Sequence, residues 1–466
     1  MKVIIFGIGN YYREQKEMLD SIDDIEIIAF ADNNVSLWNK KVDEIIVISP
    51  SLIPTFEYDR IVIMSIYVCT IYDQLLSLGV DKEKITIWEQ FCAGLVQGKR
   101  ELFPSKLSLD HLKKNVLIVS ADLGYNGGTL AAVYAALSLG QNGISVILAA
   151  PKGDKKLIKE ITDRNVNIVI WPSLPYIFDI DKEWLQQFET VIVNTLQMAE
   201  CAYQIVKICP TMWWIHEPFE MYAPVMMKYP NCKNITQLRN LNIYAVSSIA
   251  QRNYNKFFGD DRCKKILTLG IPDKATTVKQ RNQNKKTVFA IIGSVYSLKA
   301  QDIFLQAVSM LEHRDKLEFW IIGKMYDTNY CQSIREMAAN INCVKILGEL
   351  TRTEIGNLFS DIDILVCASH EETLSMTIVE AMMYGKICIV TDTTGVAEYM
   401  EDKINGFVIP CNNPNALRKK MEWIIHNKNK LNTIEDNARK TYEIYFNMET
   451  FGKNLKNALS EMRQEG

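Results

Sequence analysis

The sequence predicts an α/β fold made of three doubly wound, Rossmann-like units in succession. Short apolar runs, as expected of buried parallel strands, alternate with segments whose apolar residues recur at helical spacing. Many of the apolar runs end in a glycine-containing or polar turn, which is typical of a strand that leads into a helix. A Lys/Gln/Asn-rich stretch without apolar periodicity, residues 273–286, separates two of the units.

The composition is that of an ordinary soluble globular protein. Of the 466 residues, 48% are hydrophobic and 23% are charged, and this length exceeds a single hydrophobic core. The net charge of -3 argues against a nucleic-acid binder, which would carry a basic surplus. No apolar run reaches the roughly 18 residues of a membrane span, and Met1 leads directly into a strand rather than into a secretory signal. With eleven cysteines, no CxxC pair and five histidines, we expect a cytoplasmic protein with reduced thiols and no metal site.

The first unit is expected at residues 1–92. Gly7 and Gly9 follow its first strand, and Asp32 ends its second, where a dinucleotide-binding turn and its ribose-binding acid would lie. The third glycine of that fingerprint is replaced by Tyr12, so a strand end followed by a turn is favoured over nicotinamide binding. The segment resembles the small Rossmann-like domains attached to many bacterial sugar-modifying enzymes.

The remaining chain is expected to form two larger units and a tail. A linker is predicted at residues 93–113, the second unit at 114–275 and the third at 287–440. The tail, residues 441–466, has a helical pattern and is expected to cross back to the second unit.

Candidate site residues cluster where predicted strands of the second and third units end. Glu372 lies in the turn after the apolar run 363–369, and Glu380 lies on the helix that Ser375 is expected to cap. Glu380 falls at the edge of that helix's apolar stripe, where a half-buried carboxylate needs a hydrogen-bonding partner. The paired hydroxyls of a sugar or ribose would supply one.

A diphosphate would suit the same edge of the sheets. The helix that starts at Ser375, Met376 and Thr377 offers free backbone N–H groups to an anion, and Lys299 adds a positive charge. Across the interdomain cleft, the glycine pair at Gly127 allows close approach of the backbone to a ligand. Further candidates also follow strands: Gly128, His216 and Ser294. Leu350 and Leu374 are candidates only through the family resemblance that these motifs carry.

The order of these motifs resembles the retaining glycosyltransferases of family 4, which have the GT-B fold. The resemblance covers residues 114–466 and rests on Gly293, Lys299, Gly348, Ser369, Glu372, Glu380-Ala381, Gly385, Thr394-Gly395, Glu398 and Asn405-Gly406. It implies two Rossmann-like domains in the GT-B arrangement plus the small N-terminal domain.

The resemblance also implies roles for single residues. Glu372 would contact the transferred sugar, Glu380 the ribose and Lys299 the diphosphate of a nucleotide sugar. The glycine pair would close over the donor, His216 would approach the reacting sugar, and the loop 347–350 would face the base. The family keeps the anomeric configuration by front-face displacement and generally requires no metal or other cofactor.

The sequence departs from the family at three places near the diphosphate. Ser294 and Leu298 stand where many relatives have an arginine, and Ala300 replaces the glycine after the lysine. Thr373-Leu374-Ser375 replaces a glycine-containing turn. A metal-dependent GT-A enzyme is disfavoured, because Asp361 and Asp363 precede their strand instead of following it.

The expected partners are a nucleotide-sugar donor, most simply a UDP-sugar, and a glycan, lipid-linked or protein acceptor, with no nucleic acid. Residues 218–229 are rich in aromatic residues and methionine. We interpret them as core packing, with an acceptor lip at the inner membrane face as the alternative. A GT-B nucleotide-sugar epimerase and a non-catalytic nucleotide-sugar-binding partner remain as alternative functions.

Overall fold

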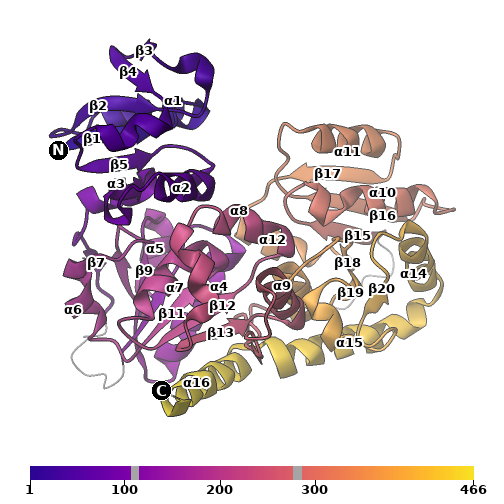
Figure 1. The fold of residues 1–466 in the computed structure, drawn as a ribbon. Helices are drawn as coiled ribbons and strands as arrows, with labels where there is room; N and C mark the ends of the chain where they lie inside the picture. The colour runs from indigo at the N-terminus through magenta and orange to yellow at the C-terminus, as the bar shows by residue number, and fades with distance from the viewer. Residues whose placement is uncertain (107–114, 276–285, 466) are drawn as a thin grey trace.

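The computed structural model describes residues 1–106, 115–275 and 286–465. It confirms the predicted fold class, since three separate, mainly parallel sheets follow one another along the chain. The first domain sits on top of the second, and the third stands beside the second (Figure 1). The linker predicted at residues 273–286 falls largely outside the described residues.

The first domain is a six-stranded sheet with the order β3-β4-β2-β1-β5-β6. Its strands are β1 (Lys2–Phe6), β2 (Glu26–Ala31), β3 (Lys41–Val42), β4 (Ile45–Ile48), β5 (Arg60–Ile63) and β6 (Ile85–Ile87). Its helices are α1 (Asn10–Asp20), α2 (Val68–Ser77) and α3 (Trp88–Leu95).

The glycine turn of the first domain is hydrogen-bonded to Asp32 of the same domain. The Asp32 carboxylate accepts hydrogen bonds from the backbone N–H groups of Ile8, at 3.0 Å, and Asn34, at 2.7 Å. Tyr12, in place of the third glycine, is 3% exposed, and its hydroxyl donates to Asp43 at 2.7 Å. These contacts take the positions that a dinucleotide would use and favour the interpretation as a strand end and a turn.

The second domain is an eight-stranded sheet with the order β14-β13-β12-β11-β8-β9-β10-β7. Its strands are β7 (Glu101–Phe103), β8 (Asn115–Val119), β9 (Ser145–Ala150), β10 (Asn167–Ile170), β11 (Thr190–Asn194), β12 (Thr211–Ile215), β13 (Leu241–Ala245) and β14 (Lys265–Ile266). Its helices are α4 (Gly127–Gln141), α5 (Lys155–Thr162), α6 (Lys182–Leu185), α7 (Ala199–Ile205), α8 (Tyr222–Met226) and α9 (Ser248–Phe258).

The described part of the predicted linker 93–113, residues 93–106, includes regular secondary structure. Helix α3 continues to Leu95, and β7 pairs antiparallel with β10 at the edge of the second sheet. Three residues are too short a run to show the alternation that identifies a strand, so no sequence pattern indicates β7.

A buried ion pair joins this connecting segment to the second domain. The Arg100 guanidinium lies 2.6 Å from Asp181, whose side chain is fully buried, and it packs over Trp171 and Trp184.

Replacing Arg100 by methionine is expected to reduce the free energy of unfolding by about 3 kcal/mol, because the Asp181 carboxylate loses its cation. Urea denaturation measures this change. In an Arg100→Met/Asp181→Asn double variant much of the loss should disappear, whereas equal loss in both variants would contradict the explanation.

The third domain is a six-stranded sheet with the order β17-β16-β15-β18-β19-β20. Its strands are β15 (Thr287–Ile292), β16 (Leu317–Ile322), β17 (Val344–Gly348), β18 (Ile364–Cys367), β19 (Ile387–Thr391) and β20 (Phe407–Ile409). Its helices are α10 (Gln301–Ser309), α11 (Asn329–Ala339), α12 (Arg352–Leu358), α13 (Met376–Met383), α14 (Pro414–His426) and α15 (Leu431–Thr441).

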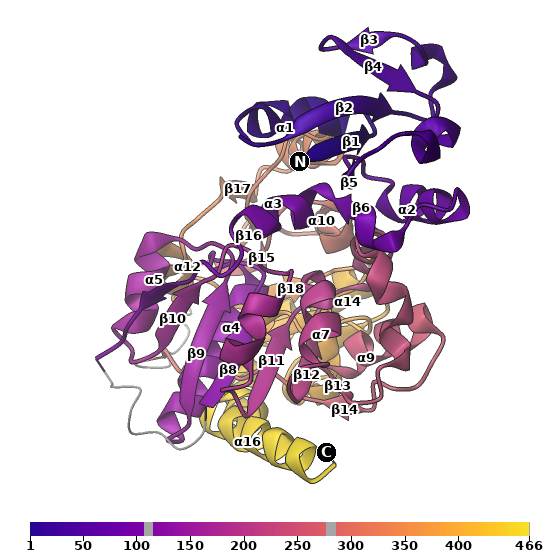
Figure 2. The ribbon, with the colours of Figure 1, turned by 60° about the vertical axis from the view of Figure 1, so that its left-hand side comes forward.

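The chain ends on the second domain. After the π-helix at Tyr442–Phe446, helix α16 (Met448–Glu465) packs against α4, and Figure 2 shows it along the lower side of the second domain. The ring of Phe451 stacks on Trp214 with centroids 5.7 Å apart. A Cβ on Gly452 would lie 2.5 Å from the hydroxyl of Ser138 and 2.8 Å from the amide nitrogen of Asn142, so a side chain there would require both of these groups to shift. The tail therefore ties the second and third domains together on the side away from the first.

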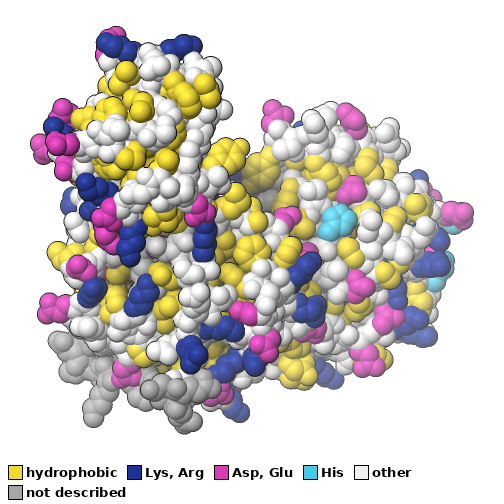
Figure 3. All heavy atoms as spheres, viewed as in Figure 1, with side chains coloured by type: hydrophobic (Ala, Val, Ile, Leu, Met, Phe, Trp, Pro, Cys, Tyr) yellow, Lys and Arg dark blue, Asp and Glu magenta, His cyan; other side chains and the backbone are white. Residues whose placement is uncertain are grey.

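The surface shows no dominant charge. Acidic and basic side chains are interspersed over the face in Figure 3, as the net charge of -3 leads one to expect. The molecule is hollowed between the first and third domains, and hydrophobic side chains are visible there (Figure 3). Among the described residues, no helix has the length and hydropathy required to span a bilayer.

Candidate functional site

A cavity of about 250 Å³ lies between the second and third domains, where strands β15 and β18 end. Gly127, the first residue of α4, forms its wall on the side of the second domain. The other lining residues that the sequence singled out come from the third domain: Lys299, Glu372, Ser375, Met376, Thr377 and Glu380. The structure therefore brings seven of the twelve candidates to one cavity.

The turn that carries Glu372 is fixed by its own backbone. Its N–H donates to the carbonyl of Thr393 at 3.1 Å, and its carbonyl accepts from Gly395 at 2.8 Å. A Cβ on Gly395 would lie 1.9 Å from the carbonyl oxygen of Thr373, so the two loops could not approach with any other residue there. The position of Glu372 is thus determined by backbone contacts, which is the precision that a binding site requires.

Ser375 does not cap α13 as the sequence predicted. It occupies the N-cap position with φ +67°, and its side chain accepts no backbone hydrogen bond. Its hydroxyl instead lies 3.4 Å from that of Thr377. The first turn of α13 consequently has no side-chain cap and faces the cavity, a geometry that suits an anion.

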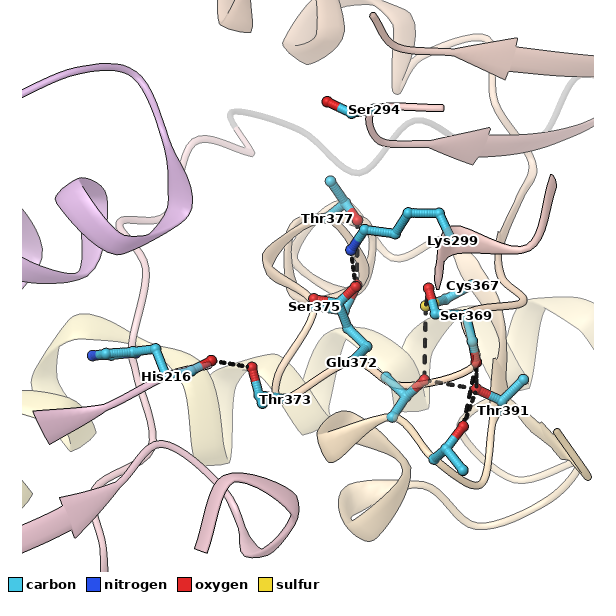
Figure 4. A network of polar contacts seen from close by, with 12 residues as sticks. His216, Ser294, Lys299, Cys367, Ser369, Glu372, Thr373, Ser375, Thr377 and Thr391 are labelled. Carbon is cyan, nitrogen blue, oxygen red and sulfur yellow. Dashed lines mark hydrogen bonds and ion pairs between the residues drawn. The ribbon is translucent and has the colours of Figure 1, made fainter. Parts of the chain in front are cut away.

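Each glutamate of the pair is held by a cation. Lys299 forms an ion pair with Glu372, and Arg352 forms one with Glu380. The four side chains are largely buried, with between 16% and 31% of their surfaces exposed. Figure 4 shows the Lys299 ammonium group directed at the Glu372 carboxylate.

Burial and pairing compete in the pKa values of these groups. Burial is the largest single influence and would lower the pKa of Lys299, but the Glu372 carboxylate together with Cys367 and Tyr296 raises that pKa above its usual range. At Glu380 burial is the stronger effect, so its pKa is raised although Arg352 and Lys274 pull it down. Arg352 is therefore the group that most favours an ionised Glu380.

Arg352 is a site residue that the sequence reasoning missed. Thr351 and Glu354 form a capping box, and Arg352 is the first residue of α12 inside it. The available signal was its position, because Arg352 follows β17 at the same edge of the sheet as Glu372.

A second, larger cavity of about 960 Å³ lies on the other side of Arg352, between α4, α5 and α12. Leu350, which lies outside the smaller cavity, lines this one. The floor includes Tyr134 and the stacked rings of Phe359 and Tyr384, with centroids 4.9 Å apart. The basic side chains on its wall are Lys156, Arg164, Lys274, Arg352 and Lys386.

His216 contacts the third domain with its backbone carbonyl and not with its imidazole ring. Its carbonyl accepts a 2.5 Å hydrogen bond from the Thr373 hydroxyl, while the ring points away from Glu372 (Figure 4). The Nε2 atom is buried and has no hydrogen-bond partner in the described parts of the chain. Burial lowers the pKa of His216 to about 3, so the imidazole is neutral at physiological pH.

Three other candidates lie outside both cavities. Gly128 packs against β11, since its carbonyl accepts from Asn194 at 2.8 Å and a Cβ would meet Thr195 at 3.1 Å. Ser294 stands apart from Lys299 and Glu372 in Figure 4. Leu374 is 4% exposed and belongs to the core. Chain position alone does not separate these three from the lining residues.

The aromatic run 218–229 lies only partly in the core, with two buried and five exposed residues. Tyr222 and Val225 of α8 are buried, whereas Met227 is 44% exposed. The N–H of Phe219 donates to Glu371 at 2.7 Å, and the same carboxylate oxygen accepts from Asn253 at 2.7 Å. The segment therefore forms part of the contact between the second and third domains.

Comparison with known proteins identifies related sequences. Residues 273–441 match the model of the glycosyl transferases group 1 family, and residues 1–86 match the C2185-like N-terminal family. An uncharacterized glycosyltransferase of Methanocaldococcus jannaschii is 27% identical over 148 residues, which are 32% of this chain and 41% of that protein.

A Campylobacter jejuni relative, N,N'-diacetylbacillosaminyl-diphospho-undecaprenol alpha-1,3-N-acetylgalactosaminyltransferase, is 26% identical over 162 residues, 34% of this chain and 42% of that protein. The chain thus spans about two fifths of the length of these two curated relatives.

The fold has close counterparts among solved structures. Anabaena HepE, solved in complex with UDP and glucose, superposes with a TM-score of 0.61 at 16% identity, covering 75% of this chain and 100% of HepE. At this identity the likeness establishes the fold, which is GT-B. The region that matches the glycosyl transferases group 1 model, residues 273–441, is thus the C-terminal half of a GT-B fold, which is preceded by an additional N-terminal domain.

Proposed function

We propose that the protein is a retaining glycosyltransferase that moves a sugar from a UDP-sugar to a glycan or lipid-linked acceptor. The observation that carries this proposal is the pair of glutamate–cation contacts at one cavity, Lys299 with Glu372 and Arg352 with Glu380. A nucleotide sugar carries anionic phosphates between two sets of hydroxyl groups. Its phosphates suit the cations and its hydroxyls suit the carboxylates.

The donor would enter by exchanging partners within this cavity. Lys299 and the uncapped first turn of α13 would bind the diphosphate, which frees Glu372 for the hydroxyls of the transferred sugar. Glu380 would accept hydrogen bonds from the ribose. Gly127 has no side chain to fill the cavity, and a Cβ there would lie 3.6 Å from the sulfur of Met376. The α4 terminus would therefore approach the phosphates closely.

The base would extend beyond Glu380 towards Leu350. The larger cavity begins there, shares Arg352 with the smaller one and has aromatic rings on its floor. A uracil presents carbonyl oxygens at its edge, which suits the basic wall. The UDP found in HepE and the diphospho-undecaprenol-linked acceptor in the Campylobacter relative's name support this choice of donor and acceptor.

Transfer would proceed on one face of the sugar. The bond from the anomeric carbon to the β-phosphate oxygen breaks, and the acceptor oxygen bonds to the same face of that carbon. The acceptor proton passes to the leaving phosphate oxygen, so no protein base is required. Lys299 and the α13 terminus stabilise the negative charge on the departing diphosphate.

Incubation with UDP-, GDP- and ADP-sugars tests the proposal. We expect UDP at a hundred times its Kd to stabilise the fold by about 2.7 kcal/mol. With acceptor, the product should keep the anomeric configuration of the donor, as read from the H1–H2 coupling constant in the proton NMR spectrum. Epimerised donor without acceptor would establish the epimerase alternative, and UDP-sugar binding without turnover would establish the non-catalytic partner.

A further inference from the structure

A third cavity lies away from the donor site, at the seam between the first and second domains. Its volume is about 580 Å³. Strand β6 and helices α2 and α3 of the first domain form one wall. The loop after β10, the start of α7 and the segment after α8 form the other.

The walls of this seam cavity are rich in aromatic rings and neutral hydrogen-bonding groups. Its aromatic residues, drawn from both domains, are Tyr72, Phe91, Tyr176, Phe178 and Tyr229. Its amide and hydroxyl side chains include Thr86, Gln90 and Asn231. Of its charged side chains, Arg60 and Lys82 are balanced by Glu83 and Glu200. The lining therefore does not select for an anion or a cation.

Two groups in the cavity are prepared for a polar ligand. The ring of Tyr176 is buried, with 3% of the residue exposed, and its hydroxyl makes no hydrogen bond within the described residues. The hydroxyl oxygen is not among the fully buried atoms that lack a partner, so it reaches the solvent of the cavity and is available to a ligand. Glu200 is 1% exposed; its Oε1 accepts hydrogen bonds from Gln204 and from Asn231, the latter at 3.0 Å, and its Oε2 accepts one from the Cys232 thiol at 3.6 Å. A carboxyl oxygen can accept two hydrogen bonds, so Oε2 has one lone pair left for a ligand.

A pyranose matches this combination of groups. One face of a pyranose ring consists of C–H groups that pack on aromatic rings, and its edge carries hydroxyls that donate to carboxylates and pair with amides and phenols. A neutral sugar also needs no charged partner. A lipid chain or an aromatic ligand would leave the Tyr176 hydroxyl unpaired.

The cavity is positioned to meet a chain of sugars that leaves the interdomain cleft. Tyr176 and Glu200 follow β10 and β11, whose carboxyl ends share the sheet edge with Gly127 and His216. The segment that begins at His216 continues through α8 to Tyr229 in the cavity wall, and α8 lies between the first and third domains in Figure 1.

We propose that the seam between the first and second domains is a saccharide subsite that holds an inner sugar residue of the acceptor. The assignment of the bound sugar to an acceptor rests on the proposed transferase function, whereas the saccharide site itself rests on the lining of the cavity. It also gives the first domain a role other than dinucleotide binding, because the Asp32 carboxylate is already hydrogen-bonded to the glycine turn of that domain. The domain would supply one wall of an acceptor site.

Saturation-transfer difference NMR on the full chain tests the site. The probes are the methyl α- and β-pyranosides of glucose, galactose, N-acetylglucosamine and N-acetylgalactosamine. We expect saturation transfer to at least one of them, strongest for the protons of one ring face. Gly94→Leu should reduce the signal at least fivefold, because Gly94 lies on the wall of α3 with Phe178 3.8 Å from its Cβ position. Tyr176→Phe should weaken the signal without adding bulk.

The matched control is Gly140→Leu, another helical glycine, whose Cβ position meets no atom within 4 Å. It should leave the saccharide signal unchanged, and all three variants should keep the UDP-dependent rise in melting temperature. No transfer to any of the pyranosides, or an equal signal in Gly94→Leu, would overturn the subsite. If the saccharide signals follow the expected pattern but UDP does not raise the melting temperature of the unmodified protein, the proposed transferase function is refuted and the subsite remains supported.

Discussion

Glu372→Gln is expected to lower the transfer rate by about two to three orders of magnitude while the Kd of UDP changes little. Glutamine keeps the size of the side chain but removes the charge that Glu372 shares with Lys299. The transferred sugar loses its strongest hydrogen-bond acceptor, whereas the ribose and diphosphate contacts remain. Steady-state kcat and calorimetric UDP affinity, measured on the same preparation, separate these two effects.

Glu371→Gln is the matched control, because this neighbouring glutamate does not line the cavity. It accepts hydrogen bonds from Phe219 and Asn253 across the domain contact, and a glutamine oxygen can accept the same bonds. We expect less than about a tenfold loss of transfer. Unchanged turnover in Glu372→Gln, or equal losses in the two variants, would refute the role of Glu372.

The sequence predicted the parts of the site that depend on the βα repeat. Strand ends in parallel sheets share one edge, so the apolar runs before Gly127, Lys299 and Glu372 were sufficient to bring these residues together. The helical period after Ser375 likewise placed Glu380 at the edge of a buried stripe. These are short-range patterns that repeat along the chain, and the fold class follows from them.

What the sequence could not give were side-chain contacts between segments far apart in the chain. The Arg352–Glu380 pair joins α12 to α13, and no local pattern links the two residues. Ser375 is a good capping residue by type, but its left-handed backbone turns the hydroxyl away from the N–H groups of α13. The seam cavity depends on how the first domain docks, which no periodicity encodes.

Arg352→Gln is expected to make UDP binding dependent on pH. Burial raises the pKa of Glu380, and Arg352 is the main group that opposes this. Without the arginine the pKa rises further, so a larger fraction of Glu380 is protonated as the pH falls. A neutral carboxyl accepts ribose hydroxyls less well than a carboxylate. The Kd of UDP should therefore be about tenfold higher than that of wild type at low pH and should fall towards the wild-type value as the pH rises.

Isothermal titration calorimetry between pH 6 and 8.5 measures this slope against two comparison proteins. Arg418→Gln removes an arginine of α14 that pairs with Glu422 at 2.5 Å and lies outside both cleft cavities, so it should behave as wild type. The terminal phosphate of UDP loses its second proton at about pH 6, so only the difference in slope from wild type reports on the protein. In the Arg352→Gln/Glu380→Gln double variant this difference should vanish, because Glu380 can no longer titrate. A difference that persists in the double variant would mean that a group other than Glu380 titrates.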